Sequence, residues 1–387
     1  MYLLRSTLVF LIALLFCSQA MALQCEATPA DEGDATEAGT PGPLSFYQPT
    51  ASVTAGSSSI TLTNAAGLSA GDMVLVIQMQ GADINSTNSN SYGDGVAGGE
   101  ASGSLNNANF TAGRYEYAAV ASVAGSTINL TSPLVYNYVR ANASGTTGQS
   151  RYQVIRVPQY DNLTLTGNIS APAWNGETGG VLPLDVANTL DFNGFSVNMN
   201  ANGFRGGGGF LHSGRTGAAN TDFRNTSSNT ATGAHGSKGE GIAGTPRYVF
   251  TGSGPRVDTG VEGYPNGSYG MGAPGNAAGG GTDGRPSNND ENSGGGGGGN
   301  GGAGARGGNS WNSNLPVGGY GGAAFPAAPN RLAMGGGGGA ASSNNGNNPS
   351  PHGGVGGGIP ARTFATSNAC FAHADDERSK GRHLGCS

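Results

Sequence analysis

The sequence predicts an all-β protein: a small N-terminal β-barrel or sandwich, then the start of a right-handed parallel β-helix with a glycine-rich, polyproline II-like insertion. Short runs of β-branched and aromatic residues alternate with turn residues, and no helical period occurs. Apolar runs also recur with Asn or Gly at their corners between residues 161 and 203. Finally, 50 of the 158 residues from 201 to 358 are glycine, a density that helices and ordinary strands do not tolerate.

Residues 1–22 have the features of a secretory signal peptide. Arg5 supplies the positive charge, residues 8–16 form the apolar segment, and Ala20, Met21 and Ala22 fit the small-x-small cleavage rule. The apolar run is too short for a comfortable membrane span. We therefore predict a secreted or cell-surface protein with no membrane span after signal cleavage.

Charge and cysteine content limit the class of protein. The 387-residue chain has a net charge of −6, only 11% of its residues are charged, and no basic cluster precedes the last residues, which argues against nucleic-acid binding. Of four cysteines, Cys17 lies in the signal peptide, which leaves Cys25, Cys370 and Cys386. This odd number is not a disulfide framework, and a bridge between Cys370 and Cys386 stays open.

The N-terminal half divides by composition. Residues 23–50 are acidic and rich in Pro and Gly, and we predict a solvated linker or extended arm. Residues 51–160 predict the barrel or sandwich, with strands near 73–79, 115–123, 127–130 and 152–157. Between the first two strands, residues 81–111 form a loop long enough to be functional or mobile. Residues 161–203 then predict two or three β-helix-like rungs.

Residues 204–358 form the glycine-rich region. Gly298, Gly301, Gly304 and Gly307 fall on every third position, and polyproline II has three residues per turn. The spacing predicts one bare edge along an extended segment, where neighbouring backbones approach closely. Aromatic residues punctuate the region more often than in flexible linkers, so we favour an ordered layer over disorder. Valine at Gly301 or Gly304 is then expected to be destabilising.

Residues 359–387 change character and hold seven charged residues and few glycines. Two interpretations stay open: a solvated charged tail without strands, or residues that follow a frameshift or truncation and are not the native continuation.

Several long phrases carry a resemblance to a known group of proteins. Among them are MVLVIQMQGADINSTNSNSYGDGVAGG, AWNGETGGVLPLDV, GSKGEGIAGTPRYVF and VGGYGGAAFPA. Residues 43–358 resemble the N-terminal portion of large glycine-rich exported bacterial surface proteins, in which conserved-repeat Ig-like modules often follow. The resemblance implies an envelope or extracellular location and an adhesive or structural role. It supplies no catalytic residues, and the chain departs from the pattern after Gly358.

No motif in the sequence indicates a catalytic, cofactor or metal site. A Gly-x-Ser-x-Gly elbow, a Walker loop and His-Glu-x-x-His are all absent. We expect the scattered histidines to lie in solvent-exposed loops (His212, His235, His352, His373 and His383). We also assign the oxygen-rich positions to soluble loops rather than to calcium binding (Asp72, Asp94, Asp283, Asp290 and Glu291).

For two sets of residues, a functional interpretation competes with a structural one. Asp185 and Asp191 flank a predicted strand, and glycosidases use two carboxylates at a defined separation, although turns of a β-helix carry Asp for conformational reasons. Four aromatic residues are candidates for stacking on sugar rings, but we favour packing within the glycine-rich layer (Tyr264, Tyr269, Trp311 and Tyr320).

The sequence therefore predicts an exported, non-enzymatic surface or extracellular protein with an adhesive or structural role. The expected partners are surface glycans or other envelope components, with no cofactor and with the oligomeric state open. One alternative is a carbohydrate-active β-helix enzyme, a polysaccharide hydrolase or lyase. Another is a truncated remnant of a larger surface protein.

Overall fold

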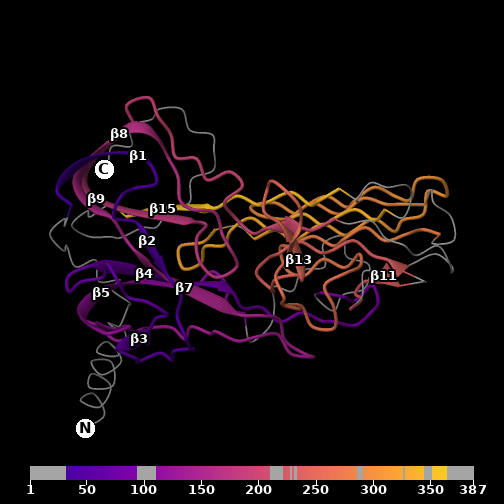
Figure 1. Ribbon diagram of the computed structural model, residues 1–387, viewed down its shortest axis with the longest axis horizontal. Helices are drawn as coiled ribbons and strands as arrows, with labels where there is room; N and C mark the ends of the chain where they lie inside the picture. The colour runs from indigo at the N-terminus through magenta and orange to yellow at the C-terminus, as the bar shows by residue number, and fades with distance from the viewer. Residues whose placement is uncertain are drawn as a thin grey trace, which may run out of the picture.

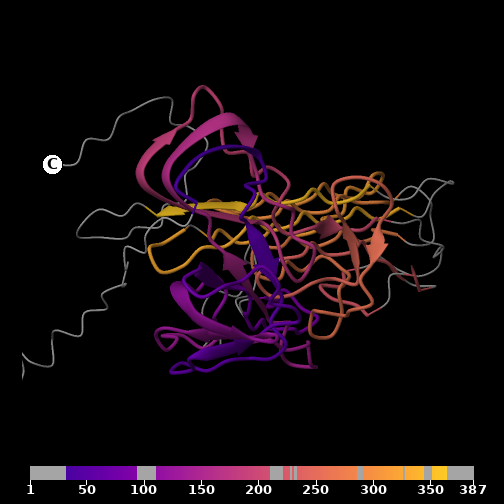
Figure 2. The ribbon, with the colours of Figure 1, turned by 60° about the vertical axis from the view of Figure 1, so that its left-hand side comes forward.

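The computed structural model describes residues 32–93, 110–209, 221–226, 229–230, 233–285, 291–325, 327–343 and 351–363. Every regular element within these ranges is a strand, so the prediction of an all-β fold is confirmed. Two β units lie at one end of the molecule, and extended glycine-rich segments run away from them (Figures 1 and 2). The predicted signal peptide, the four cysteines and residues 364–387 lie outside the described residues.

The first unit is an antiparallel sheet in the order β2-β7-β4-β5-β6-β3. Its strands are β2 (Ser45–Tyr47), β3 (Ser59–Thr61), β4 (Met73–Gln80), β5 (Tyr115–Ala124), β6 (Thr127–Leu130) and β7 (Arg151–Arg156). The chain beyond β2 pairs with β3, because Thr50 N–H donates to the Thr61 carbonyl at 2.9 Å and Thr63 N–H to the Gln48 carbonyl at 2.8 Å. These bonds join the two edge strands and close the sheet into a small barrel.

The second unit is a parallel sheet in the order β1-β8-β9-β15. Its strands are β1 (Asp34–Gly39), β8 (Gln159–Ile169), β9 (Val181–Asp191) and β15 (Ile359–Thr363). β8 begins just after β7 ends, so the chain passes from the barrel to the parallel sheet without a linker. β9 and β15 are neighbours in space but are separated in sequence by the whole glycine-rich region, which makes that region an insertion between two parallel strands.

Two predictions about the chain ends are corrected. The segment predicted as a linker, residues 23–50, contains β1 and β2; in β1 the carboxylate of Glu37 accepts from the hydroxyl of Tyr160 at 2.8 Å. β1 is an edge strand, where charged side chains are tolerated. Its acidic residues therefore gave this segment the sequence pattern of a solvated arm. Residues 359–363, predicted as the start of a strandless charged tail, form β15 with Ile359 and Ala361 buried.

The continuous apolar run of β4 follows from burial on both faces. Val74 and Val76 belong to the cluster inside the barrel, and Leu75 and Ile77 belong to the larger cluster outside it. Alternate residues of a strand face opposite sides, so a strand with two buried faces reads as unbroken hydrophobic sequence. The outer cluster also includes Leu163 and the side chains of β9, and so joins the barrel to the parallel sheet.

The glycine-rich insertion is built from extended segments that exchange backbone hydrogen bonds with a period of three. The segment 335–342 donates its backbone N–H groups to three neighbours in rotation. One neighbour accepts at residues 357, 354 and 351, from residues 335, 338 and 341. A second accepts at residues 299, 296 and 293, from residues 336, 339 and 342, and a third accepts at residues 240 and 237, from residues 337 and 340. One segment is thereby bonded to three neighbours in turn, as the three-residue turn of polyproline II requires. We call this set of segments the glycine bundle (residues 203–209, 235–242, 268–284, 293–310, 316–325, 333–342 and 351–358).

Glycine is needed in the bundle for close approach rather than for unusual torsion angles. A Cβ on Gly298 would lie 1.9 Å from the Gly336 carbonyl oxygen, and one on Gly337 would lie 1.9 Å from that of Arg205. Neither glycine has the positive φ that disfavours side chains. One prediction is corrected: Gly301 lies at a turn, and a Cβ there would meet nothing within 4 Å. Valine at Gly301 is therefore not expected to disrupt the packing.

Five short strands lie within or beside the bundle. β10 (Gly206–Gly207) pairs with β13 (Tyr248–Phe250), which pairs with β14 (Val257–Asp258), and β11 (Asn229–Thr230) pairs with β12 (Gly233–Ala234).

Candidate functional site

A shallow groove of about 540 Å³ lies on the barrel where β2 ends, beside the loop that precedes β9. The residues that line it come from β2 and its continuation, from the turn after β3 and from the β9 loop: Leu44, Ser45, Phe46, Tyr47, Gln48, Thr63, Asn64, Ala66 and Thr178. Its polar side chains are amides and hydroxyls. Such a lining can exchange hydrogen bonds with a neutral polyhydroxy ligand.

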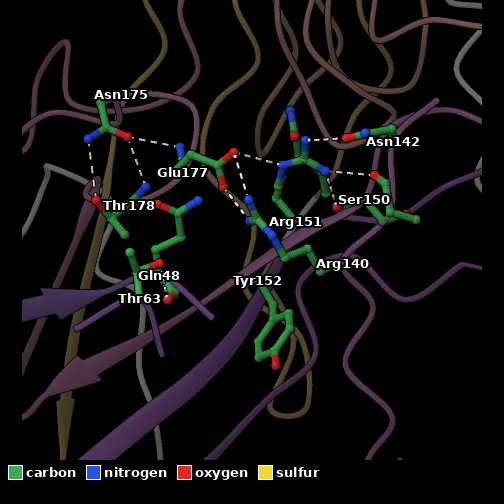
Figure 3. A network of polar contacts seen from close by, with 12 residues as sticks. Gln48, Thr63, Arg140, Asn142, Ser150, Arg151, Tyr152, Asn175, Glu177 and Thr178 are labelled. Atoms are coloured by element: carbon green, nitrogen blue, oxygen red, sulfur yellow. Dashed lines mark hydrogen bonds and ion pairs between the residues drawn. The ribbon is translucent and has the colours of Figure 1, made fainter. Parts of the chain in front are cut away.

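An ion-pair network borders this groove (Figure 3). Glu177 accepts from Arg140 Nη2 at 3.2 Å and from Arg151 Nε at 3.0 Å, and Arg151 also donates to Asn142 Oδ1 at 2.8 Å. Asn175 Oδ1 accepts from the backbone N–H groups of Glu177 and Thr178 at 2.8 and 2.9 Å, which fixes the turn that carries both residues.

The two arginines and the one carboxylate of this network carry a net charge of +1, but neither arginine lines the groove. Arg151 is buried, which lowers the pKa of its guanidinium, while the carboxylate of Glu177 acts in the opposite direction. Glu177 already satisfies both arginines, so an acidic ligand would have to displace it. The groove therefore suits a neutral ligand better than a phosphate or a carboxylate.

Three further charged residues are buried in the glycine bundle, namely Arg205, Lys238 and Glu240. Arg205 donates to Glu240 through Nε at 2.7 Å and through Nη2 at 2.8 Å. Lys238 Nζ donates to the carbonyls of Phe223 at 2.6 Å and of Gly270 at 3.1 Å, and also to that of Gly272. Burial lowers the pKa of Lys238 well below its usual value. Three carbonyl acceptors surround Nζ, so Lys238 pins two backbone segments together and is not a free nucleophile.

The expectation of exposed histidines is wrong for both histidines that the structure describes. His235 is buried, and its Nε2 lies 2.8 Å from Asp222 Oδ2; the hydrogen bond lowers the pKa of Asp222. His352 stacks on Phe250 with ring centroids 4.3 Å apart and accepts the Gly209 N–H at 2.8 Å. The other three lie outside the described residues (His212, His373 and His383).

The assignment of the acidic residues to soluble loops is also corrected. Asp72 is buried and accepts from Arg156 Nε at 2.9 Å. Asp283 and Glu291 are buried too; Asp283 accepts the Arg285 N–H at 2.9 Å and Glu291 accepts the Ser313 N–H at 3.1 Å. Among the described residues, no three acidic, His or Cys side chains form a group that would hold a metal ion. Asp94 and Asp290 lie outside those residues.

Asp185 and Asp191 do not form a glycosidase pair. They lie six residues apart on β9, or about 20 Å at the usual strand rise. Carboxylates that cleave glycosidic bonds lie about 5–9.5 Å apart. Asp185 instead accepts from Gln159 Nε2 at 3.2 Å, and Asp191 accepts the Asn193 N–H at 2.8 Å in the turn that follows.

The four candidate aromatics separate into two groups. Tyr264 and Tyr269 are buried, and the half-buried Tyr320 stacks on Phe223 with ring centroids 5.6 Å apart. Trp311 is 82% exposed. Packing within the glycine-rich layer thus holds for the tyrosines and not for Trp311.

Sequence reasoning missed the charged residues that organise these regions, namely Arg140, Arg151, Glu177, Lys238 and Glu240. The last two had a readable signal, because GSKGEG places a Lys and a Glu within an otherwise uncharged glycine-rich run. Arg140, Arg151 and Glu177 find their partners in other parts of the chain, so no local sequence pattern indicates their ion pairs.

Comparison with known proteins gives only distant similarities. No protein-family model and no curated protein matches the chain. Three bacteriophage tailspikes are similar in structure. Gp49 of Pseudomonas phage LKA1 is 15% identical with a TM-score of 0.18, over 41% of this chain and 23% of the tailspike. Gp54 of Acinetobacter baumannii bacteriophage AP22, solved in complex with A. baumannii capsular saccharide, is 14% identical with a TM-score of 0.19, over 41% and 26%. Gp61 of Pseudomonas phage phi297 is 15% identical with a TM-score of 0.17, over 43% and 33%.

The matched part thus spans a third or less of each tailspike. One prediction is corrected at this point, namely that the chain is not an enzyme. It rested only on the absence of familiar catalytic motifs, and the solved structures to which the chain is similar are tailspikes. The absence of a motif does not exclude an enzyme, and the prediction is withdrawn. Within the part of the chain that the structure describes, no helix is long and apolar enough to cross a membrane.

Proposed function

We propose that the chain is an exported surface or extracellular protein with an adhesive or structural role, in which the glycine bundle is a rigid scaffold. The observation that carries this proposal is the bonding of residues 333–342 to three neighbouring segments with a three-residue period. An extended segment held on three sides, with backbone contacts too close for any side chain, resists bending better than a flexible linker.

The anchoring of the bundle supports the same role. The bundle leaves the parallel sheet after β9 and returns to it at β15, so both of its ends are fixed to one sheet. Segments of about ten residues at about 3.1 Å per residue would reach about 30 Å from the β units. We propose that the parallel strands are the start of a right-handed β-helix and that the bundle projects from it.

Export is supported by the signal-peptide features of residues 1–22. It is also supported by the resemblance of residues 43–358 to glycine-rich exported bacterial surface proteins. We propose that the chain belongs to that group. The low charge and the amide and hydroxyl side chains of the groove favour surface glycans as partners over nucleic acids.

The location is tested by labelling intact and lysed host cells with an antibody against the purified protein, alongside N-terminal sequencing of the mature chain. We expect labelling of intact cells or recovery from the medium, and a mature N-terminus at Leu23. Deletion of residues 2–22 should confine the protein to the cell interior. Labelling that appears only after lysis of cells expressing the full chain would contradict the proposal.

A further inference from the structure

One loop of the glycine bundle presents a large aromatic ring to solvent. Residues 309–315 connect two extended segments, and within them Trp311 is 82% exposed, more than any other large hydrophobic residue that the structure describes. The other tryptophan, Trp174, is only 2% exposed. Tryptophan carries the largest apolar side chain, so Trp311 exposes a large apolar surface to solvent, where a ligand can reach it.

The loop is held in one conformation by hydrogen bonds. Ser310 N–H donates to the Leu315 carbonyl at 2.9 Å, and Leu315 N–H donates back to Ser310 Oγ at 2.9 Å. Trp311 N–H donates to the Asn292 carbonyl at 3.1 Å, and the buried Glu291 accepts the Ser313 N–H. A fixed backbone under an exposed ring lowers the entropy that a ligand must remove on binding.

The loop also lies at the end of the bundle away from the β units. Near the opposite end, Leu332 N–H donates to the Gly113 carbonyl at 2.8 Å, just before β5, and Phe325 meets Phe110 at 5.2 Å. From that end the segments run through the pair Gly297–Ala305 and then Gly294–Gly308 before the loop begins. Trp311 is thus carried at the outer end of the scaffold, where a partner has access to it.

We propose that Trp311 is the stacking platform of a binding site for a neutral oligosaccharide, with a pyranose ring lying against the indole and its hydroxyl groups bonded to the loop. This inference deepens the proposed adhesive function and rests on it. The neighbours of Trp311 in the loop carry amides and hydroxyls, which suit sugar hydroxyls (Asn309, Asn312, Ser313 and Asn314). Within the loop, Asn309 Nδ2 donates to Asn314 Oδ1 at 3.1 Å and the Ser313 hydroxyl donates to the carboxylate of Glu291. A rigid aromatic surrounded by Asn and Ser is also the composition that many recognition surfaces use.

The size and charge of the surface favour a sugar over other partners. The other exposed large hydrophobics, Val135, Phe192, Phe195 and Val257, belong to the barrel, to the turn after β9 and to β14. One ring offers far less area than the roughly 800 Å² per partner of a stable protein interface. Two described cations lie near the loop: Arg306, 4.2 Å from the Tyr320 ring and donating to the Gly318 carbonyl, and Arg285, whose charge acts on Glu291. Among the described residues these two do not make the basic cluster that a membrane surface would attract.

The presence of only two tryptophans makes the site measurable by fluorescence. Acrylamide should quench the emission of Trp311 and spare that of the buried Trp174. We expect members of a panel of neutral oligosaccharides to protect Trp311 from acrylamide in a saturable way. Trp311→Ala should weaken binding of the same sugar about tenfold or more, measured by calorimetry, with an unchanged melting temperature. Trp311→Phe should retain part of the affinity.

The matched control is Phe192→Ala, which removes an exposed ring from the turn after β9 and should leave sugar binding unchanged. Three outcomes would overturn the inference: no saccharide in the panel protects Trp311, Trp311→Ala binds as tightly as the original chain, or phosphatidylcholine vesicles protect the ring instead. None of these results depends on where the protein resides in the host, so failure here is distinguishable from failure of the proposed location.

Discussion

Gly304 lies so close to Gly297 that a Cβ on Gly304 would sit 1.9 Å from the carbonyl oxygen of Gly297. Real Cβ atoms do not approach an oxygen so closely, and here the obstacle is backbone, which cannot rotate away. Three residues earlier in the chain, a Cβ on Gly301 would meet nothing within 4 Å. Both glycines belong to the same three-residue repeat, but only Gly304 faces the backbone of a neighbouring segment.

Alanine at Gly304 should therefore destabilise the protein, and alanine at Gly301 should not. We expect Gly304→Ala to lower the free energy of unfolding by about 1–3 kcal/mol, because the two segments must move apart. Gly301 has no positive φ, so Gly301→Ala should be neutral or stabilising by up to about 1 kcal/mol through the unfolded chain. Thermal melting of both variants tests this, and equal melting temperatures would contradict the packing described for the bundle.

This contrast shows what the sequence can reveal about the bundle. The spacing of Gly298, Gly304 and Gly307 correctly predicted close backbone contact, since a three-residue period is a local property of the chain. Which glycine meets which carbonyl depends on segments about 150 residues away, as in the pair of Gly203 and Gly356. The exception at Gly301 arises because the chain turns there, and the Asn300-Gly301 dipeptide that signals a turn outweighs the glycine period at this position.

The buried pair of Arg205 and Glu240 should be costly to break from either side. Arg205→Met would leave a buried carboxylate whose remaining side-chain donor is Thr245 Oγ1 at 2.7 Å, and we expect a loss of about 3–5 kcal/mol. Denaturant unfolding measures this loss. The exposed pair of Arg247 and Asp258 is the matched control, and Arg247→Met should cost about 1 kcal/mol or less.

The same pair predicts how stability changes with pH. Burial by itself would raise the pKa of Glu240, but the charge and hydrogen bonds of Arg205 outweigh it and hold the pKa below its ordinary value. A carboxyl group with a lowered folded pKa stabilises the protein above its unfolded pKa of about 4.5 and loses that contribution as pH falls further. Unfolding free energies from pH 7 to pH 3 should therefore fall less steeply in Glu240→Gln than in the original chain. Parallel curves would show that the carboxylate is not held by Arg205.

Lys238 should act as a structural crosslink between backbone segments. Lys238→Met keeps much of the side-chain volume and removes the ammonium donor from the carbonyls of Phe223, Gly270 and Gly272. The Phe223 and Gly270 carbonyls still accept the N–H groups of Gly272 and Gly280, both at 2.9 Å. The Gly272 carbonyl loses its donor, and an unsatisfied buried carbonyl costs about 1–3 kcal/mol, so the variant should lose about that much stability. Hydrogen exchange should then increase in the segments around residues 223 and 270–272, and unchanged protection there would contradict the role of Lys238.

The β units were the more predictable part of the chain. The runs that became β4 and β7 follow from their β-branched residues and from the turns that bound them. By contrast, β1 was missed because its acidic residues suited solvent, and its pairing with β8 joins residues more than 120 positions apart. The groove and its ion pairs were missed for the same reason, since Glu177 meets Arg140 only after the barrel and the β9 loop are assembled.

Glu177 should hold the β9 loop against the barrel through its two arginines. Glu177→Gln keeps the shape of the side chain and removes the charge that Arg140 and the buried Arg151 share. We expect a loss of about 1–3 kcal/mol, most of it from Arg151, because a buried cation that loses its counter-ion is costly whereas a part-exposed one is screened. A double-mutant cycle separates the two arginines: the coupling of Glu177→Gln with Arg151→Met should exceed its coupling with Arg140→Met. Equal couplings would mean that burial of Arg151 does not set the strength of the network.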